Sequence, residues 1–377
     1  MRKTTIFCLH RAIKLTFSLL LFAGLTGCED PRPIVLGFVG GTSGKVADLG
    51  VAGRNGFILA VEQRNAAGGI QSKPIEIILK DDKQTESLAK TAVEELVAAK
   101  VDAIIGPMTS AMAIASVDII NQNKTLMMGA TVTTNKLTNI DDYFFRTLSA
   151  TRDHAAVTAN FLRQEKGVRS FSAIYDIRNK AYTEDWLDDF TAAIEAQGAS
   201  LKVRKSFESS NDLAFGKIAD ALLVEPADVV VMVVNSVDAA LLAKHIRQRN
   251  PQQMLATSEW AGTERLVELG GSYVDGTIVP QYLDRDSQDS DYLKFRSEFL
   301  QRFKQEPGFP GLVAYNATNV VLNALEKTTT KGGLKDTLLS IRTFKGIGGD
   351  ITFSPTGDAS TKTYITQIVD GKFRLQK

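Results

Sequence analysis

The chain has 377 residues, of which 44% are hydrophobic and 23% are charged, and this is the composition of an ordinary globular protein. Its length favours two domains, and its net charge of +1 gives no basic footprint for binding nucleic acid. Only two cysteines and three histidines occur. This excludes a disulfide-stapled scaffold and a cysteine-based zinc cluster and disfavours a multi-histidine metal site, so we expect no metal and no cofactor.

The first 27 residues have the pattern of a targeting segment. They contain four basic residues and no acidic one, and the chain is almost wholly apolar from Leu15 to Ala23. A basic segment followed by an apolar core of about 7 to 15 residues is typical of a secretory signal peptide. A membrane anchor that is retained is the alternative, although this run is shorter than the about 20 residues of a spanning helix.

The segment Leu25-Thr26-Gly27-Cys28 follows directly and resembles the bacterial lipobox. The resemblance implies cleavage before Cys28 and acylation of its thiol. We therefore expect a lipoprotein signal peptide at 1–27 and a lipidated tether at 28–33. The protein is then extracytoplasmic (periplasmic or on the outer face of the cell membrane), and the acylated Cys28 holds it to the lipid bilayer.

After the tether, short apolar runs alternate with helical patterns. Strands are predicted at 34–39, 75–79, 101–105 and 126–128, and helices at 46–65, 85–99 and 109–121. The strands are apolar throughout rather than alternating, which is typical of a parallel sheet that helices cover on both faces. The same alternation restarts near residue 149, with strands at 171–175, 200–207, 229–234, 254–257 and 277–279 and helices at 153–164, 183–196, 212–224, 237–249 and 263–269.

The last hundred residues are mostly helical and end in a hairpin. Helices are predicted at 292–305, 312–327 and 334–341, and Asp370-Gly371 suits a tight turn between strands at 364–369 and 372–375. The fold class is thus α/β, with two Rossmann-like lobes whose parallel sheets are joined by a hinge. We divide the chain into lobe 1 at 34–148, lobe 2 at 149–280, a return to lobe 1 at 281–350, and a C-terminal β segment near the hinge and lobe 2 at 351–377.

The sequence carries no catalytic constellation, so we expect a protein that is not an enzyme. The glycines after the first strand do not have the dinucleotide-binding spacing, and no G-x-S-x-G nucleophile elbow occurs. His154 and His245 lie in predicted helices beside charged neighbours, and we predict that both are exposed. Asp81-Asp82 is interpreted as a strand end.

Four short segments resemble one known family. They are Gly68-Gly69-Ile70 with the strand that follows it, the turn Ile104 to Ser110, the turn Thr131 to Thr138, and Gly346 to Phe353. In this order and spacing they resemble the leucine/isoleucine/valine-binding proteins among the type I periplasmic binding proteins, over nearly all of residues 33–377. The resemblance implies a type I periplasmic binding protein fold, an amino acid ligand, an ABC transporter permease as partner, and a monomer.

The resemblance also implies site residues in lobe 1. Family members hold the α-carboxylate with a serine that matches Ser110, and they add groups from the next turn, which match Thr131 and Thr133. Physical chemistry supports this placement, because ligands bind beyond the carboxyl ends of parallel strands and helix N-termini favour anions. The alternatives are a plain helix N-cap for Ser110 and a loop-ordering hydroxyl for Thr133.

In lobe 2, Tyr182 matches a ligand-contacting tyrosine and Glu259 matches the acid that holds the α-ammonium. Trp260 is a candidate floor for the side-chain pocket. The alternative for Tyr182 is a half-buried aromatic residue, that for Glu259 is a helix N-terminal glutamate, and that for Trp260 is ordinary packing. Asn235 and Ser236 are weaker candidates, and Leu49 stands where relatives often have an aromatic wall residue.

These features predict a lipid-anchored solute-binding protein that delivers an amino acid, branched-chain or a related small carboxylate, to an ABC transporter. The same fold in a ligand-sensing signalling system is the main alternative. An extracytoplasmic enzyme and a ligand-independent scaffold are further alternatives.

Overall fold

The computed structural model describes residues 32–45, 47–329 and 333–376. The predicted signal peptide and Cys28 lie outside these ranges. The chain separates into Met1–Pro33 and one compact unit at Ile34–Lys377, and everything below concerns the second unit. Within the described ranges, no helix combines the length and the apolar character that a bilayer crossing requires.

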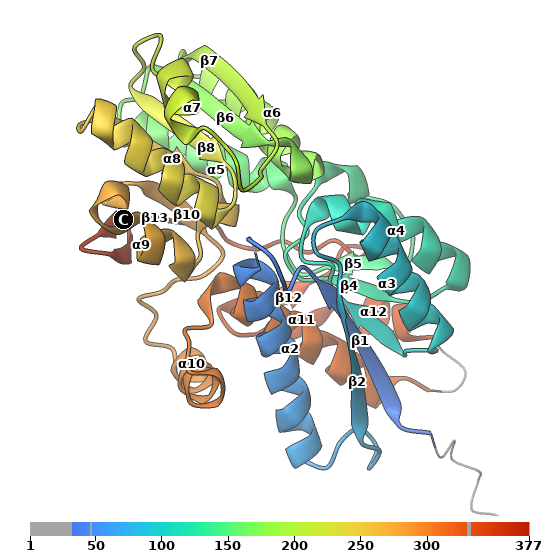
Figure 1. Cartoon of the computed structure of the whole chain (residues 1–377). Helices are drawn as coiled ribbons and strands as arrows, with labels where there is room; N and C mark the ends of the chain where they lie inside the picture. The colour runs from blue at the N-terminus through green and yellow to red at the C-terminus, as the bar shows by residue number, and fades with distance from the viewer. Residues whose placement is uncertain (1–31, 46, 330–332, 377) are drawn as a thin grey trace, which may run out of the picture. The chain divides into compact units, whose positions relative to one another are not determined.

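The first sheet has five parallel strands in the order β2-β1-β3-β4-β5 (Figure 1). The strands are β1 (Ile34–Gly40), β2 (Ile75–Asp81), β3 (Ala103–Ile105), β4 (Met127–Gly129) and β5 (Phe144–Arg146), and the connecting helices are α2 (Asp48–Ala66), α3 (Glu86–Ala98) and α4 (Ser110–Asn123). Successive side chains of β1 enter different cores. Leu36 and Phe38 pack with Phe57 of α2, whereas Val39 packs with Val93 of α3. Helices therefore bury both faces, as the uniformly apolar strands predict.

The second sheet has seven strands in the order β14-β13-β10-β9-β8-β6-β7. Five of them are parallel: β6 (Ser170–Asp176), β7 (Ser200–Phe207), β8 (Val229–Val233), β9 (Met254–Thr257) and β10 (Ile278–Gln281). The predicted hairpin, β13 (Tyr364–Val369) and β14 (Lys372–Leu375), adds to β10 in the antiparallel direction. The helices of this lobe are α5 (Thr151–Gln164), α6 (Lys180–Glu195), α7 (Phe215–Leu222), α8 (Ser236–Arg249) and α9 (Glu264–Gly270).

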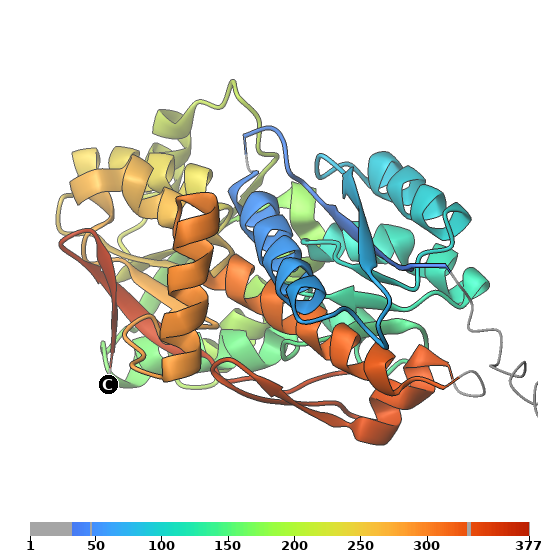
Figure 2. The same ribbon diagram turned by 90° about the horizontal axis from the view of Figure 1, so that it is seen from below.

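The chain then returns to the first lobe. The returning elements are α10 (Ser290–Phe303), α11 (Gly308–Lys327), α12 (Leu334–Ile341) and the hairpin of β11 (Thr343–Gly346) and β12 (Gly349–Thr352). Figure 2 shows α11 running beside α2. The two helices approach closely at Gly56, because a Cβ atom there would lie 2.1 Å from the carbonyl oxygen of Gly311. Helix α11 begins four residues earlier than predicted, since Pro310 is tolerated in a first helical turn.

Three segments connect the two lobes, at 147–150, 282–289 and 353–363. Two of them are tied together by Ser149 and Thr361. The backbone N–H of Ser149 donates to the Thr361 hydroxyl at 3.0 Å, and the N–H of Thr361 donates to the Ser149 hydroxyl at 2.7 Å. This reciprocal pair of hydrogen bonds fixes the spacing of the connecting segments 147–150 and 353–363.

The prediction that His154 is exposed is wrong. His154 is buried at the start of α5, its ring lies 4.8 Å from that of Tyr282, and its Nδ1 atom contacts the hydroxyl of Thr363. The side of α5 that carries His154 faces the connecting segments rather than solvent. The spacing of apolar residues within one helix cannot reveal such a contact. The residues Asp81 and Asp82 differ in their burial. Asp82, which follows the strand, is fully buried, whereas Asp81 is half-buried.

Candidate ligand-binding site

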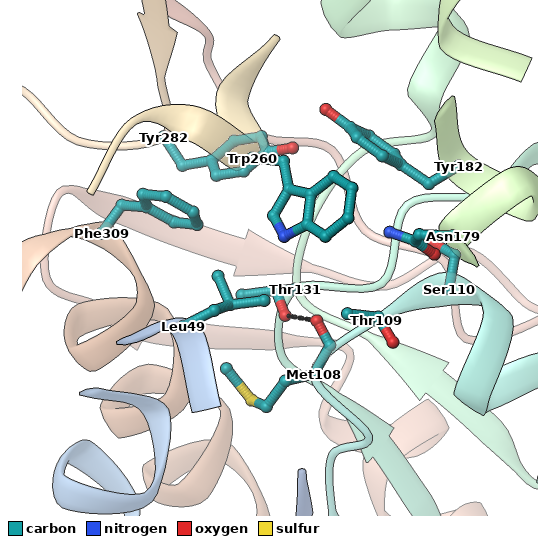
Figure 3. A pocket seen from close by; sticks show the side chains of 10 residues that line it. All are labelled: Leu49, Met108, Thr109, Ser110, Thr131, Asn179, Tyr182, Trp260, Tyr282 and Phe309. Carbon is teal, nitrogen blue, oxygen red and sulfur yellow. Dashed lines mark hydrogen bonds between the residues drawn. The ribbon is translucent and has the colours of Figure 1, made fainter. Parts of the chain in front are cut away.

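A small pocket lies where the loops beyond the strand ends of both sheets meet (Figure 3). Most of the residues that line it are buried. Both lobes contribute to the lining, which consists of Leu49, Met108, Thr109, Ser110, Thr131, Asn179, Tyr182, Trp260, Tyr282 and Phe309. Four of the predicted site residues are among them: Ser110, Thr131, Tyr182 and Trp260.

One end of the pocket is the N-terminus of α4. Gly106 turns the chain from β3 toward this helix with φ of +107°, and a Cβ atom there would lie 2.1 Å from the Val39 carbonyl oxygen. Thr109 occupies the N-cap position but makes no side-chain capping bond. In this first turn the N–H of Ala111 donates to the side chain of Asn179 at 3.1 Å. The N-terminal end of a helix favours a negatively charged group.

Ser110 connects the first turn of α4 to the turn after β4. Its Oγ atom accepts the backbone N–H groups of Thr133 and Thr134 at 3.4 and 3.3 Å. Because a hydroxyl has one hydrogen and two lone pairs, both lone pairs are used and the hydrogen remains available to donate. Thr131 also lines the pocket, and its hydroxyl donates to the carbonyl of Met108 at 2.5 Å.

Thr133 is not part of the lining. It is fully buried, and its hydroxyl accepts a hydrogen bond from that of Thr151 at 3.0 Å. The Thr151 backbone N–H also donates to the Thr133 carbonyl, at 2.7 Å. Thr133 thus orders the loop behind the pocket wall in this structure.

The opposite side of the pocket is aromatic. The rings of Tyr182 and Trp260 meet at right angles with centroids 6.3 Å apart, and Tyr282 meets Phe309 at 5.3 Å. Leu49 completes this wall together with the methionine of the β3–α4 turn. Such a lining favours an apolar group on the ligand.

Glu259 lies behind Tyr182 rather than in the lining. Its Oε2 atom accepts the Tyr182 hydroxyl and the indole N–H of Trp186, both at 2.9 Å. Its Oε1 atom is buried and has no hydrogen-bond partner within the described residues. Burial raises the pKa of Glu259 to about 7, although the two donors oppose this shift. An unpartnered buried carboxylate oxygen is suited to receiving a cation.

Burial also raises the pKa of Tyr182 and that of Tyr282 well above the ordinary value, and the charge of Glu259 adds to this effect. Both phenols therefore remain neutral at physiological pH, and that of Tyr182 donates to Glu259. In the described part of the chain, no three His, Cys, Asp or Glu side chains are grouped as metal ligands.

Polar contacts also join the lobes outside the pocket. Lys45 pairs with Asp238, and Asp48 accepts hydrogen bonds from the hydroxyls of Ser236 and Thr263 at 2.6 and 2.5 Å. Asn235 accepts the N–H of Asp238 as the N-cap of α8. Asn235 and Ser236, the weaker candidates, therefore lie at a contact between the lobes rather than in the pocket.

Sequence reasoning missed Asn179, Tyr282 and Phe309. A usable signal existed for two of them, because Tyr282 directly follows β10 and Asn179 lies three residues after β6, where ligand-binding loops are expected. Phe309 had no such signal, since it comes from the start of α11 in the returning segment.

Two α/β lobes with a pocket beyond their strand ends have the architecture of proteins that bind small molecules between two lobes. The sequence model of the periplasmic binding proteins matches residues 33–372, and the chain belongs to this family. Its fold is that of the type I periplasmic binding proteins, and the curated relatives that it matches are Leu/Ile/Val-binding proteins rather than enzymes.

Individual relatives are distant but similar over nearly their whole length. The Leu/Ile/Val-binding protein homolog 3 of Brucella melitensis is 24% identical over 90% of this chain and 92% of its own. A branched-chain amino acid transporter substrate-binding protein of Streptococcus pneumoniae, solved with isoleucine, is 21% identical with a TM-score of 0.82, covering 91% of this chain and 98% of its own. A solute-binding protein of Rhodopseudomonas palustris, solved with 3,4-dihydroxybenzoic acid, is 20% identical with a TM-score of 0.81, covering 90% of this chain and 95% of its own.

Proposed function

We propose that this protein is the extracytoplasmic solute-binding component of an ABC transporter and that it carries an amino acid with an apolar side chain, or a related small carboxylate. One observation carries the proposal: one pocket has the N-terminus of α4 with Ser110 at one end and aromatic walls opposite, and Glu259 lies behind Tyr182 with a buried oxygen that has no partner in the described residues. These groups complement an α-carboxylate, an apolar side chain and an α-ammonium respectively. The names of the relatives support the same class of ligand.

A thermal-shift screen over the standard amino acids and small carboxylates, including benzoate, tests the ligand. A ligand at about one hundred times its Kd should stabilise the protein by roughly 2.7 kcal/mol. Ser110→Ala and Glu259→Gln should each weaken binding, whereas Ser116→Ala serves as a control, because Ser116 is buried in the same helix and bonds only to its own helix backbone. If no amino acid and no carboxylate raises the melting temperature, the proposal fails.

The proposal includes membrane attachment through an acylated Cys28, supported by the lipobox that precedes it. The full chain should be recovered with membranes, and mass spectrometry of its N-terminal peptide should show a lipid-modified cysteine. Cys28→Ser should release it to the soluble fraction. Recovery of wild-type protein in the soluble fraction with a free thiol would contradict this part. We also propose that the protein acts as a monomer, which light scattering tests.

A further inference from the structure

Asn179 crosses from the second lobe to the N-terminus of α4 in the first. Its Oδ1 atom accepts the backbone N–H of Ala111 at 3.1 Å, in buried surroundings. A backbone N–H can only donate, so the atom that meets it must be the amide oxygen, and this fixes the orientation of the whole amide group. The Nδ2 group must therefore point the other way.

That other direction is the pocket. Asn179 is 4% exposed and belongs to the pocket lining, and Figure 3 shows its nitrogen directed into the pocket. No residue in the described ranges accepts a hydrogen bond from this Nδ2 group. The two hydrogens of this Nδ2 group are therefore available to a ligand in the pocket.

We infer that Asn179 is a further ligand-binding and specificity-determining residue, whose Nδ2 group donates to the carboxylate of the ligand while its Oδ1 atom holds the first turn of α4. The inference rests on the proposed function, and it adds a donor from the second lobe to a carboxylate site otherwise built from the first.

The arrangement couples ligand recognition to closure. Ser110 can donate its hydroxyl hydrogen to a carboxylate whether or not the lobes are together, because its own partners, Thr133 and Thr134, are in the same lobe. Asn179 reaches the site only when the second lobe is in contact with α4. A ligand that has no hydrogen-bond acceptor at this end leaves the donors of Ser110 and Asn179 without a partner. It therefore stabilises the closed arrangement of the lobes less.

Asn179→Asp keeps an oxygen that accepts the Ala111 N–H, replaces the donor and adds a negative charge, and Asn179→Ala removes the donor without adding charge. A carboxylate at a helix N-terminus is favourable, so the ligand-free melting temperature should not fall. Binding of L-leucine, or of whichever amino acid binds the wild type most tightly, should weaken by about tenfold to a hundredfold, the usual strength of a hydrogen bond to a charged group. Leucinamide, which has no carboxylate, should lose much less affinity than leucine.

The control is Asn135→Ala, which removes a contact between the lobes outside the pocket, from Asn135 Nδ2 to Asp189 at 2.6 Å. If Asn179→Asp does not fold, Asn179→Ser replaces it. Serine keeps a side-chain oxygen but lacks the amide nitrogen, so this variant should show the same loss of affinity. Calorimetry that gives any folded variant of Asn179 a Kd within twofold of the wild-type value, or a loss no larger than that of Asn135→Ala, overturns the inference. The proposed function still stands after that result if the wild type binds an amino acid or a carboxylate. A wild type that binds neither overturns the inference and the proposed function together.

Discussion

Lys45 and Asp238 form an ion pair at 2.6 Å between residues 193 positions apart, one from each lobe. The Asp238 side chain is completely buried, and its second oxygen accepts the amide of Asn235 at 2.7 Å. The Lys45 ammonium also donates to the Ser210 carbonyl and lies 5.3 Å from the ring of Phe215. One side chain of the first lobe thus contacts three groups of the second, and these contacts exist only while the lobes are together.

Lys45→Met should therefore favour the open arrangement. It leaves the buried Asp238 without its cation, and we expect a loss of about 1.5 kcal/mol in closure, or about tenfold in ligand affinity. Small-angle scattering of the ligand-free protein and calorimetry with the bound amino acid measure the two effects. Lys80→Met is the matched control, because Lys80 pairs with Glu95 inside the first lobe. Equal affinities for the two variants would show that the Lys45 pair does not hold the lobes.

Glu259 should make stability depend on pH. Its pKa rises from 4.5 to about 7 on folding, because burial disfavours the charged form. The folded state then binds the proton more tightly, so this contribution to stability is complete below pH 4.5 and is lost as the pH rises to about 7. Glu259→Gln should remove that loss, and chemical denaturation of the ligand-free proteins at pH 5 and pH 8 measures it. A difference between variant and wild type that is independent of pH would contradict the assignment.

His154 should act in the opposite direction. Burial lowers its pKa from 6.5 to about 3, so the unfolded chain binds the proton more tightly. The stability that it contributes is present above pH 6.5 and is lost as the pH falls toward 3. His154→Gln should flatten the acid side of the stability profile, and His245→Gln is the control at a partly exposed position. Nuclear magnetic resonance titration that places the His154 pKa near 6.5 would refute the prediction.

Gly56→Ala should destabilise the first lobe. The added methyl would lie 2.1 Å from the Gly311 carbonyl oxygen, so α2 and α11 must separate, at a cost of about 1 to 3 kcal/mol. Gly216→Ala in α7 is the control, since its methyl would meet only the flexible end of Arg249 at 3.2 Å. That variant should be neutral or gain up to about 1 kcal/mol. Denaturant unfolding compares the two, and equal stabilities would contradict this view of the helix contact.

Sequence periodicity predicted the long and strongly patterned elements well. The strand at 200–207 and the C-terminal hairpin were placed with their observed bounds, because apolar residues at alternate positions and an Asp-Gly turn are local signals. Strand β5 was missed because it has only three residues and ends in Arg146. That arginine is buried because it pairs with Asp358 at 2.7 Å, a partner more than two hundred residues away.

The site was predictable to the extent that strand ends mark it. Ser110 and Thr131 follow β3 and β4 closely, and rules for open sheets direct attention to both. What sequence cannot give is the arrangement across the two lobes. The donors that reach Glu259 come from Tyr182 and Trp186 of another element, and the contact between Asn179 and α4 depends on how the lobes meet.

The position of β13 has a consequence for the order in which the chain is made. This strand comes from the last fourteen residues, yet it lies inside the second sheet between β10 and β14. Helix α11, which covers α2, also belongs to the final quarter of the chain. The second sheet is therefore incomplete, and α2 lacks its covering helix, until these late segments of the chain have been synthesised.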